Sequence, residues 1–351
     1  MQAIVEQFRR QVLAATSNHA PLRLRGGGSK DWYGQAAAGD LLDTRAYAGV
    51  VDYEPTELVI TARCGTPLAE IEALLAQHRQ MLAFEPPRYG AASTIGGVVA
   101  AGLSGPRRAS AGAVRDFVLG AKLMDGHGEV LNFGGQVMKN VAGYDVSRLL
   151  AGSLGTLGLI LEVSLKVLPL PLREATLRFE LDEITALRRL NEWAGQPLPV
   201  SASCWHRGVL TLRLSGADAA VRAALLKLGG AQLAEEEAAS WWSSLRDQTH
   251  DHFGGADLWR LSVPPAASAV ILKGEQLIEW GGGQRWLKVE QGNAQEIRST
   301  AAAVGGHATL FRAQDKSAGV FHPLAPALAK IHERVKLAFD SAGIFNPGRM
   351  Y

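Results

Sequence analysis

Cysteine is scarce in this chain, which has only Cys64 and Cys204 among its 351 residues. Two thiols are too few for a disulfide framework, a four-cysteine zinc site or an iron–sulfur cluster held by this chain alone. Excess charge is also lacking, because 36 Lys and Arg residues oppose 34 Asp and Glu residues and leave a net charge of +2. So small an excess gives no basic footprint for a polyanion, and we expect no nucleic-acid partner.

The chain also lacks a long apolar run. The longest such stretch, residues 94–103, contains three glycines and is much shorter than the ~20 residues of a membrane-spanning helix. Residues 2–16 place Ile4, Phe8 and Val12 at helical spacing, with charged residues between them, so an amphipathic helix is favoured over a secretory signal. We expect a cytoplasmic protein without a transmembrane segment; peripheral association with the inner membrane through partner subunits stays open.

Glycine, by contrast, is abundant, and 15 of the 39 glycines lie between residues 90 and 158. This region has none of the Ser, Gln and Pro bias of a flexible linker, so ordered backbone turns are indicated. Tryptophan is distributed the other way, since Trp32 alone precedes residue 170 and seven tryptophans follow it. The two shifts in composition place a domain boundary near Pro169 and Pro171.

Hydrophobic periodicity predicts several elements. Residues 58–62 form a strand, a helix follows with Thr66 as N-cap and Pro67 as first residue, and residues 117–124 and 129–133 form a hairpin. Strict alternation over residues 159–167 predicts a half-buried strand. Mixed short strands and helices in the C-terminal half predict an α+β domain with an antiparallel sheet. The pieces predicted there are residues 175–181, 183–193, 209–214, 219–228, 258–263, 285–290, 295–304, 308–311 and 326–339.

Three glycine clusters are candidates for ligand binding. The first follows an alternating apolar and basic run and reads Arg-Gly-Gly-Gly-Ser at residues 25–29. Consecutive glycines of this kind can present backbone N–H groups to an anion. The second cluster spans residues 86–102, and the third comprises residues 143–145 and 152–158. Their repetition beside strands and helices indicates one elongated ligand that lies against main chain.

Other glycine-dependent sites are excluded by their spacing. The Rossmann turn G-x-G-x-x-G fails at Leu131, which stands where the third glycine belongs, and the Walker loop is absent. Residues 151–155 resemble a variant nucleophile elbow, but they lead into a predicted strand where an elbow opens a helix. A serine hydrolase is therefore disfavoured.

These clusters, together with the ending at residues 339–348, resemble the FAD-binding fold of the vanillyl-alcohol oxidase and p-cresol methylhydroxylase (PCMH) superfamily. Residues 104–108, 114–120, 133–145 and 257–262 further resemble the smaller flavin-binding subunits of bacterial glycolate oxidases. The resemblance implies an α+β fold: a PCMH-type FAD-binding domain of two α+β subdomains (residues 1–171), an α+β cap domain with an antiparallel sheet (172–325), and a C-terminal segment (326–351) that returns to the FAD domain.

The same resemblance implies where FAD would lie. Carried over by position, the residues that would hold the pyrophosphate are Arg25, Gly26, Gly27, Gly28, Ser29, Ser93, Thr94, Gly96 and Gly97. Pro86 is a further expected cofactor-binding residue, as is Asn346, which would return to the flavin domain from near the C-terminus. Gly102, Gly112 and Arg115 would line the flavin or ribityl path, and Gly155, Thr156 and Ile160 would contact the adenine side. An apolar, planar ring system with a dianionic diphosphate suits a glycine-lined slot.

This sequence differs from other members of the superfamily at positions that bear on its function. Members that attach FAD covalently often use a histidine in the first glycine cluster; residues 25–29 contain none, so we expect noncovalent FAD. Members that oxidise 2-hydroxy acids share G-D-G-N-x-x-H and E-H-G segments, and neither is present. The expected protein is an FAD-binding subunit of a glycolate oxidase complex, which converts glycolate and related 2-hydroxy acids to 2-oxo acids with a catalytic flavin subunit and an iron–sulfur subunit. It would hold flavin without being the main catalytic subunit. A self-sufficient FAD-dependent 2-hydroxy-acid dehydrogenase and a structural subunit that has lost the cofactor remain open.

Candidate catalytic groups are few. Oxidation of a 2-hydroxy acid needs a cation for the carboxylate, and Arg107, Arg108 and Arg260 are the candidates because a guanidinium pairs bidentately with a carboxylate. No residue stands out as the base. His250 and His252 have the spacing of one face of a strand, but only Asp247 and Asp251 lie nearby as further ligands, so we expect no metal site.

Overall fold

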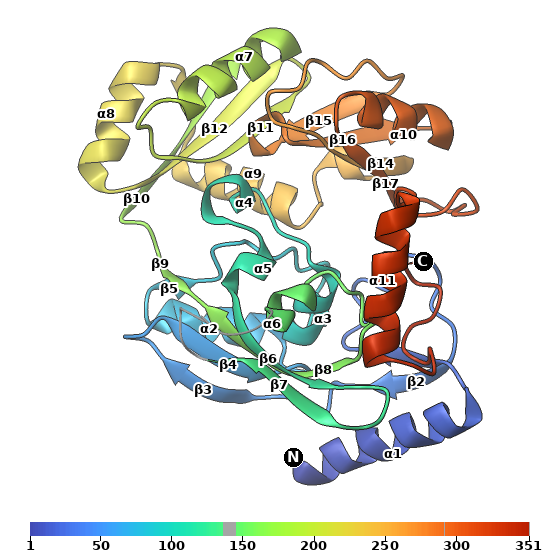
Figure 1. Cartoon of the computed structure of the whole chain (residues 1–351). Helices are drawn as coiled ribbons and strands as arrows, with labels where there is room; N and C mark the ends of the chain where they lie inside the picture. The colour runs from blue at the N-terminus through green and yellow to red at the C-terminus, as the bar shows by residue number, and fades with distance from the viewer. Residues whose placement is uncertain (136–144, 291, 351) are drawn as a thin grey trace. The chain divides into compact units, whose positions relative to one another are not determined.

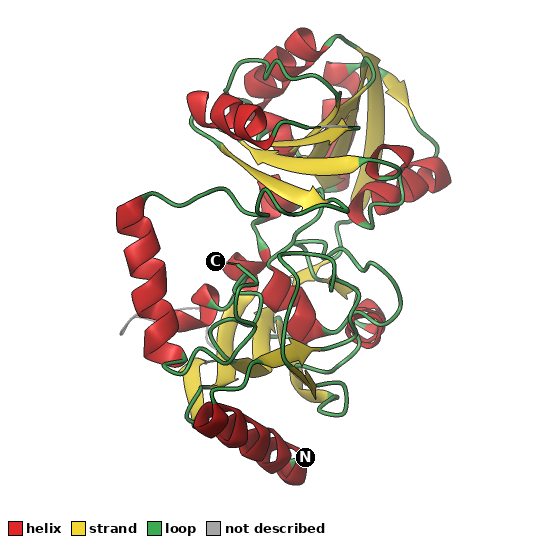
Figure 2. Cartoon of the chain, turned by 90° about the vertical axis from the view of Figure 1, so that its right-hand side faces the viewer, coloured by secondary structure: helices red, strands yellow, loops and turns green. Residues whose placement is uncertain are grey.

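The structure, a computed structural model, describes residues 1–135, 145–290 and 292–350, which divide into two units (Figure 1). Unit 1 comprises Met1–Leu103, Ala113–Pro169 and the chain from Pro323 onward, and unit 2 comprises Ser104–Gly112 and Leu170–His322. The segment Ser104–Gly112, assigned from sequence to the FAD-binding domain, clusters with unit 2. Both units combine helices with antiparallel sheets, which confirms the α+β prediction (Figure 2).

Unit 1 is built on a five-stranded antiparallel sheet in the order β3-β4-β8-β6-β7. Two short pairs accompany it, parallel β1-β2 and antiparallel β5-β9. Its strands are β1 (Leu22–Arg25), β2 (Asp40–Asp43), β3 (Val50–Glu54), β4 (Val59–Arg63), β5 (Gln80–Met81), β6 (Val118–Met124), β7 (Val130–Gly134), β8 (Leu159–Lys166) and β9 (Leu168–Pro169). Its helices are α1 (Gln2–Asn18), α2 (Leu68–Gln77), α3 (Ile95–Ala101), α5 (Val114–Phe117), α6 (Val146–Leu149) and α11 (Pro326–Phe339).

The predicted hairpin is confirmed as β6 and β7, but the prediction of a half-buried β8 is wrong. All of β8 except Lys166 is buried because it is the central strand of the sheet. Its one acidic side chain, Glu162, is paired inside the fold: it accepts a hydrogen bond from the Tyr47 hydroxyl (3.0 Å) and an ion pair from Lys122 (2.8 Å). Alternation in a sequence shows only which residues are polar. A strand whose polar side chains are buried and hydrogen-bonded has the same alternation as a strand with one face in solvent.

The start of α2 also differs from the prediction. The helix begins at Leu68 with Pro67 in the cap position. Thr66 does not cap it, because its hydroxyl donates to the carbonyl of Arg63 (2.7 Å) and accepts from the N–H of Gly49 (2.9 Å).

Unit 2 contains an eight-stranded antiparallel sheet in the order β13-β10-β12-β11-β15-β16-β14-β17. Its strands are β10 (Arg173–Glu180), β11 (Val200–His206), β12 (Val209–Gly216), β13 (Ala231–Gln232), β14 (Asp257–Ser262), β15 (Glu275–Glu279), β16 (Gln284–Val289) and β17 (His307–Arg312). Its helices are α4 (Arg108–Ala111), α7 (Glu183–Ala194), α8 (Asp218–Leu228), α9 (Glu235–Arg246), α10 (Ala294–Ala303) and the 3₁₀ turns η1 (Asp251–Phe253) and η2 (Trp280–Gly282).

Two apolar clusters hold this sheet to its helices. Leu190 and Trp193 of α7 and Val221 of α8 pack on β10 and β12, and Ile297 and Ala301 of α10 pack on β14, β16 and β17. Most predicted pieces of this unit correspond to these elements within a few residues. Strands β11 and β15 and helix α9 were missed, and the predicted strand spacing of His250 and His252 is wrong, because His252 lies in η1 with His250 at its N-cap.

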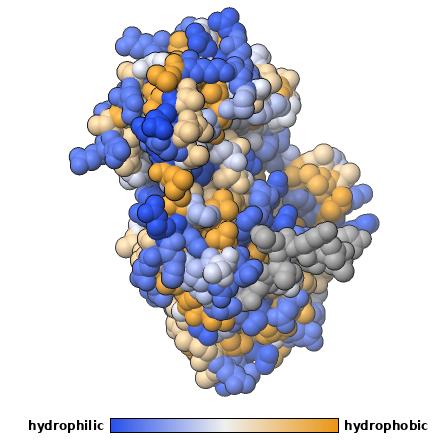
Figure 3. All heavy atoms as spheres, turned by 90° about the vertical axis from the view of Figure 1, so that its left-hand side faces the viewer, coloured by the Kyte–Doolittle hydropathy of each residue, from blue (hydrophilic) through white to orange (hydrophobic). Residues whose placement is uncertain are grey.

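The surface of the two units carries both polar and apolar side chains. On the face drawn in Figure 3, hydrophilic and hydrophobic residues are interspersed. Within the described parts of the chain, no helix combines the length and the apolar character needed to cross a bilayer.

Candidate functional site

Two cavities of about 480 and 400 Å³ lie in unit 1 at the end of β1. They share several lining residues and therefore adjoin. The residues common to both are Leu24, Arg25, Gly26, Gly97, Ala100, Leu154 and Asn346. The first cavity adds Gly27, Gly28, Ser29, Lys30, Asp31, Thr94, Ala101 and Arg349, and the second adds Thr44, Cys64, Gly96, Gly155, Gly158, Leu159 and Ile160.

The first two glycine clusters meet by backbone contact. β1 ends at Arg25, and a Cβ on Gly27 would lie 1.4 Å from the carbonyl oxygen of Ala92, so only glycine fits there. Gly97, in the first turn of α3, has an open face, because a Cβ added to it would meet only Thr94 Oγ1, at 3.3 Å. A side chain at residue 97 would therefore project into space that both cavities share. The arrangement leaves main chain of both glycine clusters open to the cavities, and the binding of a ligand there stays a prediction.

Asn346 joins three distant segments at these cavities. Its side chain is buried, its Oδ1 accepts a hydrogen bond from Leu24 N (2.9 Å), and its Nδ2 donates to Leu154 O (2.7 Å). The C-terminal segment thus connects strand β1 to the loop of the third glycine cluster. In that loop, Gly155 has φ 72°, and a Cβ there would approach Asn346 Nδ2 to 2.8 Å.

The turn that carries Asn346 is held by Asp340. This carboxylate is fully buried and accepts hydrogen bonds from Ile344 N (3.0 Å), Phe345 N (2.8 Å) and Lys336 Nζ (2.5 Å). Lys336 also donates to the carbonyl of Thr156 (2.6 Å), so the same ammonium ties α11 to the third glycine cluster.

Lys30 places a positive charge beside the glycine loop, in a cavity that Arg25 and Arg349 also line. Its ammonium contacts Ser29 Oγ (3.2 Å) and Ser93 Oγ (3.0 Å) and lies 5.9 Å from the centre of the Tyr89 ring. Burial lowers the pKa of Lys30 to about 8. An ammonium held by neutral groups in a partly desolvated loop gains strongly from an anionic ligand.

Most residues predicted for FAD reach these cavities. The lining residues are Arg25, Gly26, Gly27, Gly28, Ser29, Thr94, Gly96, Gly97, Gly155, Ile160 and Asn346. Pro86, Ser93, Gly102, Gly112, Arg115 and Thr156 are not among them. Gly143 and Tyr144, quoted for the third cluster, and residues 136–142 of the family resemblance lie outside the described residues.

The predicted residues outside the lining have varied surroundings. Ser93 accepts from Lys30, and Thr156 Oγ1 donates to Ser153 O (2.7 Å). Gly102 ends α3 with φ 66°, where a Cβ would lie 2.6 Å from Gly152 Cα. Arg115 is exposed and lies 3.9 Å from Asp116, and Gly112 clusters with unit 2. Their roles toward FAD stay predictions.

Sequence reasoning missed several lining side chains. Lys30 directly follows the first cluster, and Ala100 lies one helical turn after Gly97, so position alone was a usable signal for both. Leu154 lies within the third glycine cluster, whereas nothing in the sequence marks Cys64 or Arg349. Arg349 reaches the site because its guanidinium donates to the carbonyls of Lys30 (3.2 Å), Asp31 (3.3 Å) and Tyr33 (2.8 Å), which bring the C-terminus onto the loop.

The arginines predicted for substrate binding have partners in unit 2. Arg107 is buried and pairs with Glu174 (2.5 Å) and Ser215 (3.2 Å). Burial alone would raise the pKa of Glu174, but the charges of Arg107 and Arg213 hold it below its usual value. Arg108 stacks at 4.4 Å on the Trp280 ring, and Arg260 lies 5.5 Å from the Phe311 ring. These contacts explain the three arginines structurally, and a substrate role for them stays a prediction.

A further cavity of about 950 Å³ lies within unit 2. Its described lining includes Trp193, Trp280 and Asn191 and contains no charged side chain. Such a lining offers no cation to a carboxylate.

Comparisons with known proteins identify similar sequences and folds. Residues 4–134 match the FAD binding domain family. The fold is similar to that of a substrate-bound p-cresol methylhydroxylase, with a TM-score of 0.70 and 14% identity over 98% of this chain and 87% of that one. It is also similar to alkyldihydroxyacetonephosphate synthase, with a TM-score of 0.69 and 15% identity over 97% of this chain and 74% of that one.

The fold and the glycine-lined cavities define a protein with an FAD-binding domain of the PCMH type, and its cofactor is FAD. Over its whole length the chain is 48% identical to the glycolate oxidase subunit GlcE of Escherichia coli, covering 97% of that protein. The chain belongs to the family of this glycolate oxidase subunit. It is also 32% identical to the glycolate oxidase subunit GlcD of Bacillus subtilis, over 39% of this chain and 29% of that protein.

Proposed function

We propose that this chain is the FAD-binding subunit of a glycolate oxidase complex, which oxidises glycolate and related 2-hydroxy acids to 2-oxo acids. The observation that carries the proposal is the similarity over the full chain to a glycolate oxidase subunit. The open face of Gly97 and the main-chain lining of the two cavities support retention of the cofactor.

The residues of unit 1 would bind and orient FAD, which supplies a hydride acceptor when bound. Backbone N–H groups of residues 26–29 would hold the diphosphate, and Lys30 would neutralise part of its charge. Asn346 would keep β1 and the third glycine cluster in register around the ligand. Since residues 25–29 contain no histidine, we infer that FAD is held noncovalently.

We infer that electrons leave through partners, namely a catalytic flavin subunit and an iron–sulfur subunit. Cys64 and Cys204 are free and buried, and they lie in different units. Burial raises the pKa of the Cys64 thiol to about 12, which disfavours the thiolate that an iron–sulfur cluster needs. We retain the prediction of a cytoplasmic location with membrane association only through the complex, which cell fractionation tests.

We infer that the chain does not oxidise glycolate by itself. The cavity of unit 2 offers no charged side chain among its described residues, and both 2-hydroxy-acid oxidase segments are missing from the sequence. A self-sufficient dehydrogenase needs a cation for the substrate carboxylate and a base for its hydroxyl.

The test is purification of the chain alone and with its partner subunits. We expect flavin absorbance from the isolated chain, release of FAD on denaturation, and glycolate-dependent dye reduction only by the complex. A colourless chain that gains no FAD on reconstitution would point to a structural subunit. Dye reduction by the isolated chain would point to a self-sufficient dehydrogenase.

A further inference from the structure

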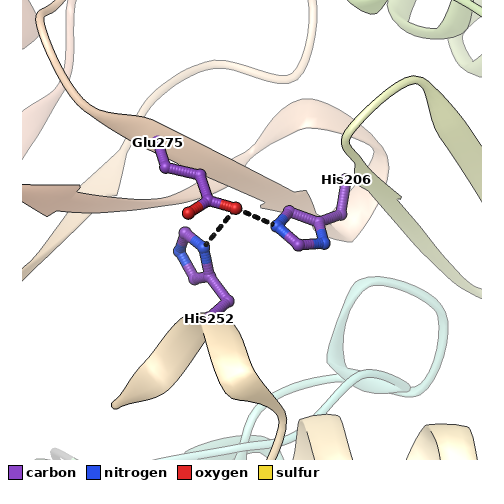
Figure 4. Close-up of side chains that lie close together, drawn as sticks. All are labelled: His206, His252 and Glu275. Carbon is purple, nitrogen blue, oxygen red and sulfur yellow. Dashed lines mark hydrogen bonds and ion pairs between the residues drawn. The ribbon is translucent and has the colours of Figure 1, made fainter. Parts of the chain in front are cut away.

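Two histidines and a glutamate from three separate elements of unit 2 point toward one another (Figure 4). His206 ends β11, His252 lies in η1, and Glu275 begins β15. Their three ligand atoms lie within 4.8 Å of one another. Glu275 Oε1 is 2.7 Å from His206 Nε2 and 3.9 Å from His252 Nδ1. Bonds of 2.0–2.1 Å to Zn²⁺ would place such atoms about 3.3 Å apart, so the observed distances lie on either side of that value.

His252 has a free lone pair inside the fold. Its side chain is fully buried, and its Nε2 lies 3.2 Å from the carbonyl oxygen of Trp286. Because a carbonyl only accepts, Nε2 carries a proton, and in the neutral ring Nδ1 then carries none. Nδ1 has no hydrogen-bond partner and is aimed at Glu275, although leaving a buried acceptor unpaired destabilises the fold. A histidine whose other ring nitrogen is bound to a backbone carbonyl is the usual arrangement of a metal ligand.

The charge states of the three groups suit a cation. Burial lowers the pKa of His252 to about 4 and also lowers that of His206, so both rings are neutral near pH 7. Burial alone would raise the pKa of Glu275, but hydrogen bonds from His206 and Arg207 bring it down to about 2. Neutral imidazole and ionised carboxylate are the forms that bind metals.

We propose that His206 Nε2, His252 Nδ1 and Glu275 Oε1 form a binding site for a divalent transition metal of the Zn²⁺ type. Two imidazole nitrogens and one carboxylate oxygen are a donor set of Zn²⁺, and a water completes the tetrahedron. His206 now donates from Nε2 to Glu275, so on binding the metal its ring proton moves to Nδ1 or to solvent. The ion enters from the side of Glu275, whose side chain is 29% exposed, whereas His252 is closed to solvent.

Arg207 competes with the ion for the same oxygen. Its Nε lies 2.6 Å from Glu275 Oε1, and its side chain is 71% exposed. The guanidinium can leave for solvent when a metal arrives, so it sets the affinity without blocking the site. Arg207 has φ 48°, a backbone conformation that asparagine tolerates, which makes Arg207→Asn a suitable variant.

The proposed ion would join three elements of unit 2, namely β11, η1 and β15. The segment before η1 is positioned by His250, whose Nδ1 accepts from the N–H of His252 (3.2 Å). A metal would tie this segment to strands β11 and β15 and stabilise the folded state of unit 2 by mass action.

The test is titration of the full-length, tag-free, metal-stripped chain with ZnCl₂ by calorimetry and with CoCl₂ by visible absorption. We expect one ion per chain and the intense d–d bands of tetrahedral Co²⁺. His252→Ala and the conservative Glu275→Gln should each weaken binding more than tenfold, because loss of even an outer partner of a ligand typically costs about 10–100-fold. Arg207→Asn should strengthen it.

His78→Gln is the matched control, since His78 is an exposed histidine of unit 1 and should leave the titration unchanged. Circular dichroism of each variant separates misfolding from ligand loss, and Glu275→Gln, which retains size and shape, remains decisive if His252→Ala unfolds. Equal binding by wild type and Glu275→Gln, or no saturable binding by the wild type, would overturn the proposal.

Discussion

Gly97 is the residue on which the proposed cofactor site depends most directly. It lines both cavities, and the only atom near a Cβ built on it is Thr94 Oγ1. Gly97→Trp should therefore fill the shared space and abolish FAD retention while the chain still folds. The measurement is flavin absorbance of the purified variant, with its circular dichroism spectrum as a check on folding.

The control is Gly195→Trp. Gly195 is exposed at the end of α7, has φ −81°, and would place its Cβ 3.7 Å from the nearest carbonyl oxygen. This variant should retain wild-type flavin content. Full occupancy in Gly97→Trp would mean that the ligand does not lie along the second glycine cluster.

Lys30 should make FAD binding dependent on pH. Burial holds the pKa of the free ammonium at about 8, and the diphosphate should raise it, so FAD binding takes up a proton above that pH. Affinity should be constant below pH 7 and weaken by up to about tenfold per pH unit above pH 8. Fluorescence titration of the apoprotein with FAD from below to well above pH 8 measures this.

Lys30→Met should bind FAD more weakly at neutral pH and show a flat profile. Lys227→Met, at an exposed lysine on α8 of unit 2, should retain the wild-type profile. If the affinity of the wild type for FAD did not change through pH 8, groups other than Lys30 would have to bind the diphosphate.

The C-terminal segment after α11 is a structural part of the proposed cofactor site. Asn346 satisfies Leu24 N and Leu154 O, two backbone groups far apart in the sequence. Asn346→Ala leaves both unpaired and should lower the free energy of unfolding by about 2 kcal/mol, with an added cost from φ 41° at that residue. FAD content should fall in parallel.

Denaturant unfolding monitored by circular dichroism, with flavin released measured alongside, checks this expectation. Asn132→Ala is the control, since Asn132 is exposed on strand β7 of the same unit. Equal stabilities of the two variants would show that the Asn346 hydrogen bonds contribute little.

The two units should respond to different ligands. The proposed FAD contacts lie in unit 1, and the proposed metal ligands lie in unit 2. Ligand at 100 times its Kd stabilises the state that binds it by about 2.7 kcal/mol. Hydrogen exchange should slow on FAD addition mainly in peptides covering residues 22–31, 94–101, 153–160 and 340–349. Zn²⁺ should slow exchange mainly in peptides covering residues 200–209, 250–260 and 272–280. If FAD slowed exchange only in unit 2 and Zn²⁺ only in unit 1, both proposed sites would be contradicted.

Local sequence determined many of the secondary-structure elements of this protein. Glycine clustering, the alternation of β1 and the hairpin β6–β7 depend on neighbouring residues, so composition and periodicity were sufficient to predict an α+β chain whose glycine clusters are ordered turns. The family resemblance added the cofactor and the returning C-terminal segment. Even so, the alternation of β8 indicated a solvent face that does not exist, because Tyr47 and Lys122 satisfy Glu162 from other strands and loops.

Only tertiary structure decided which distant residues meet. Strands β11 and β15 were not predicted, and they carry His206 and Glu275, so the sequence suggested His250 and His252 as metal ligands without these two partners. His252 joins residues 46 positions before it and 23 after it, and no local pattern encodes such a meeting. Likewise Asn346 reaches Leu24 across 322 positions. The few cysteines and the small net charge limited the classes of function, whereas sheet pairing determined which side chains form sites, because backbone hydrogen bonds between strands bring together residues that the chain itself keeps apart.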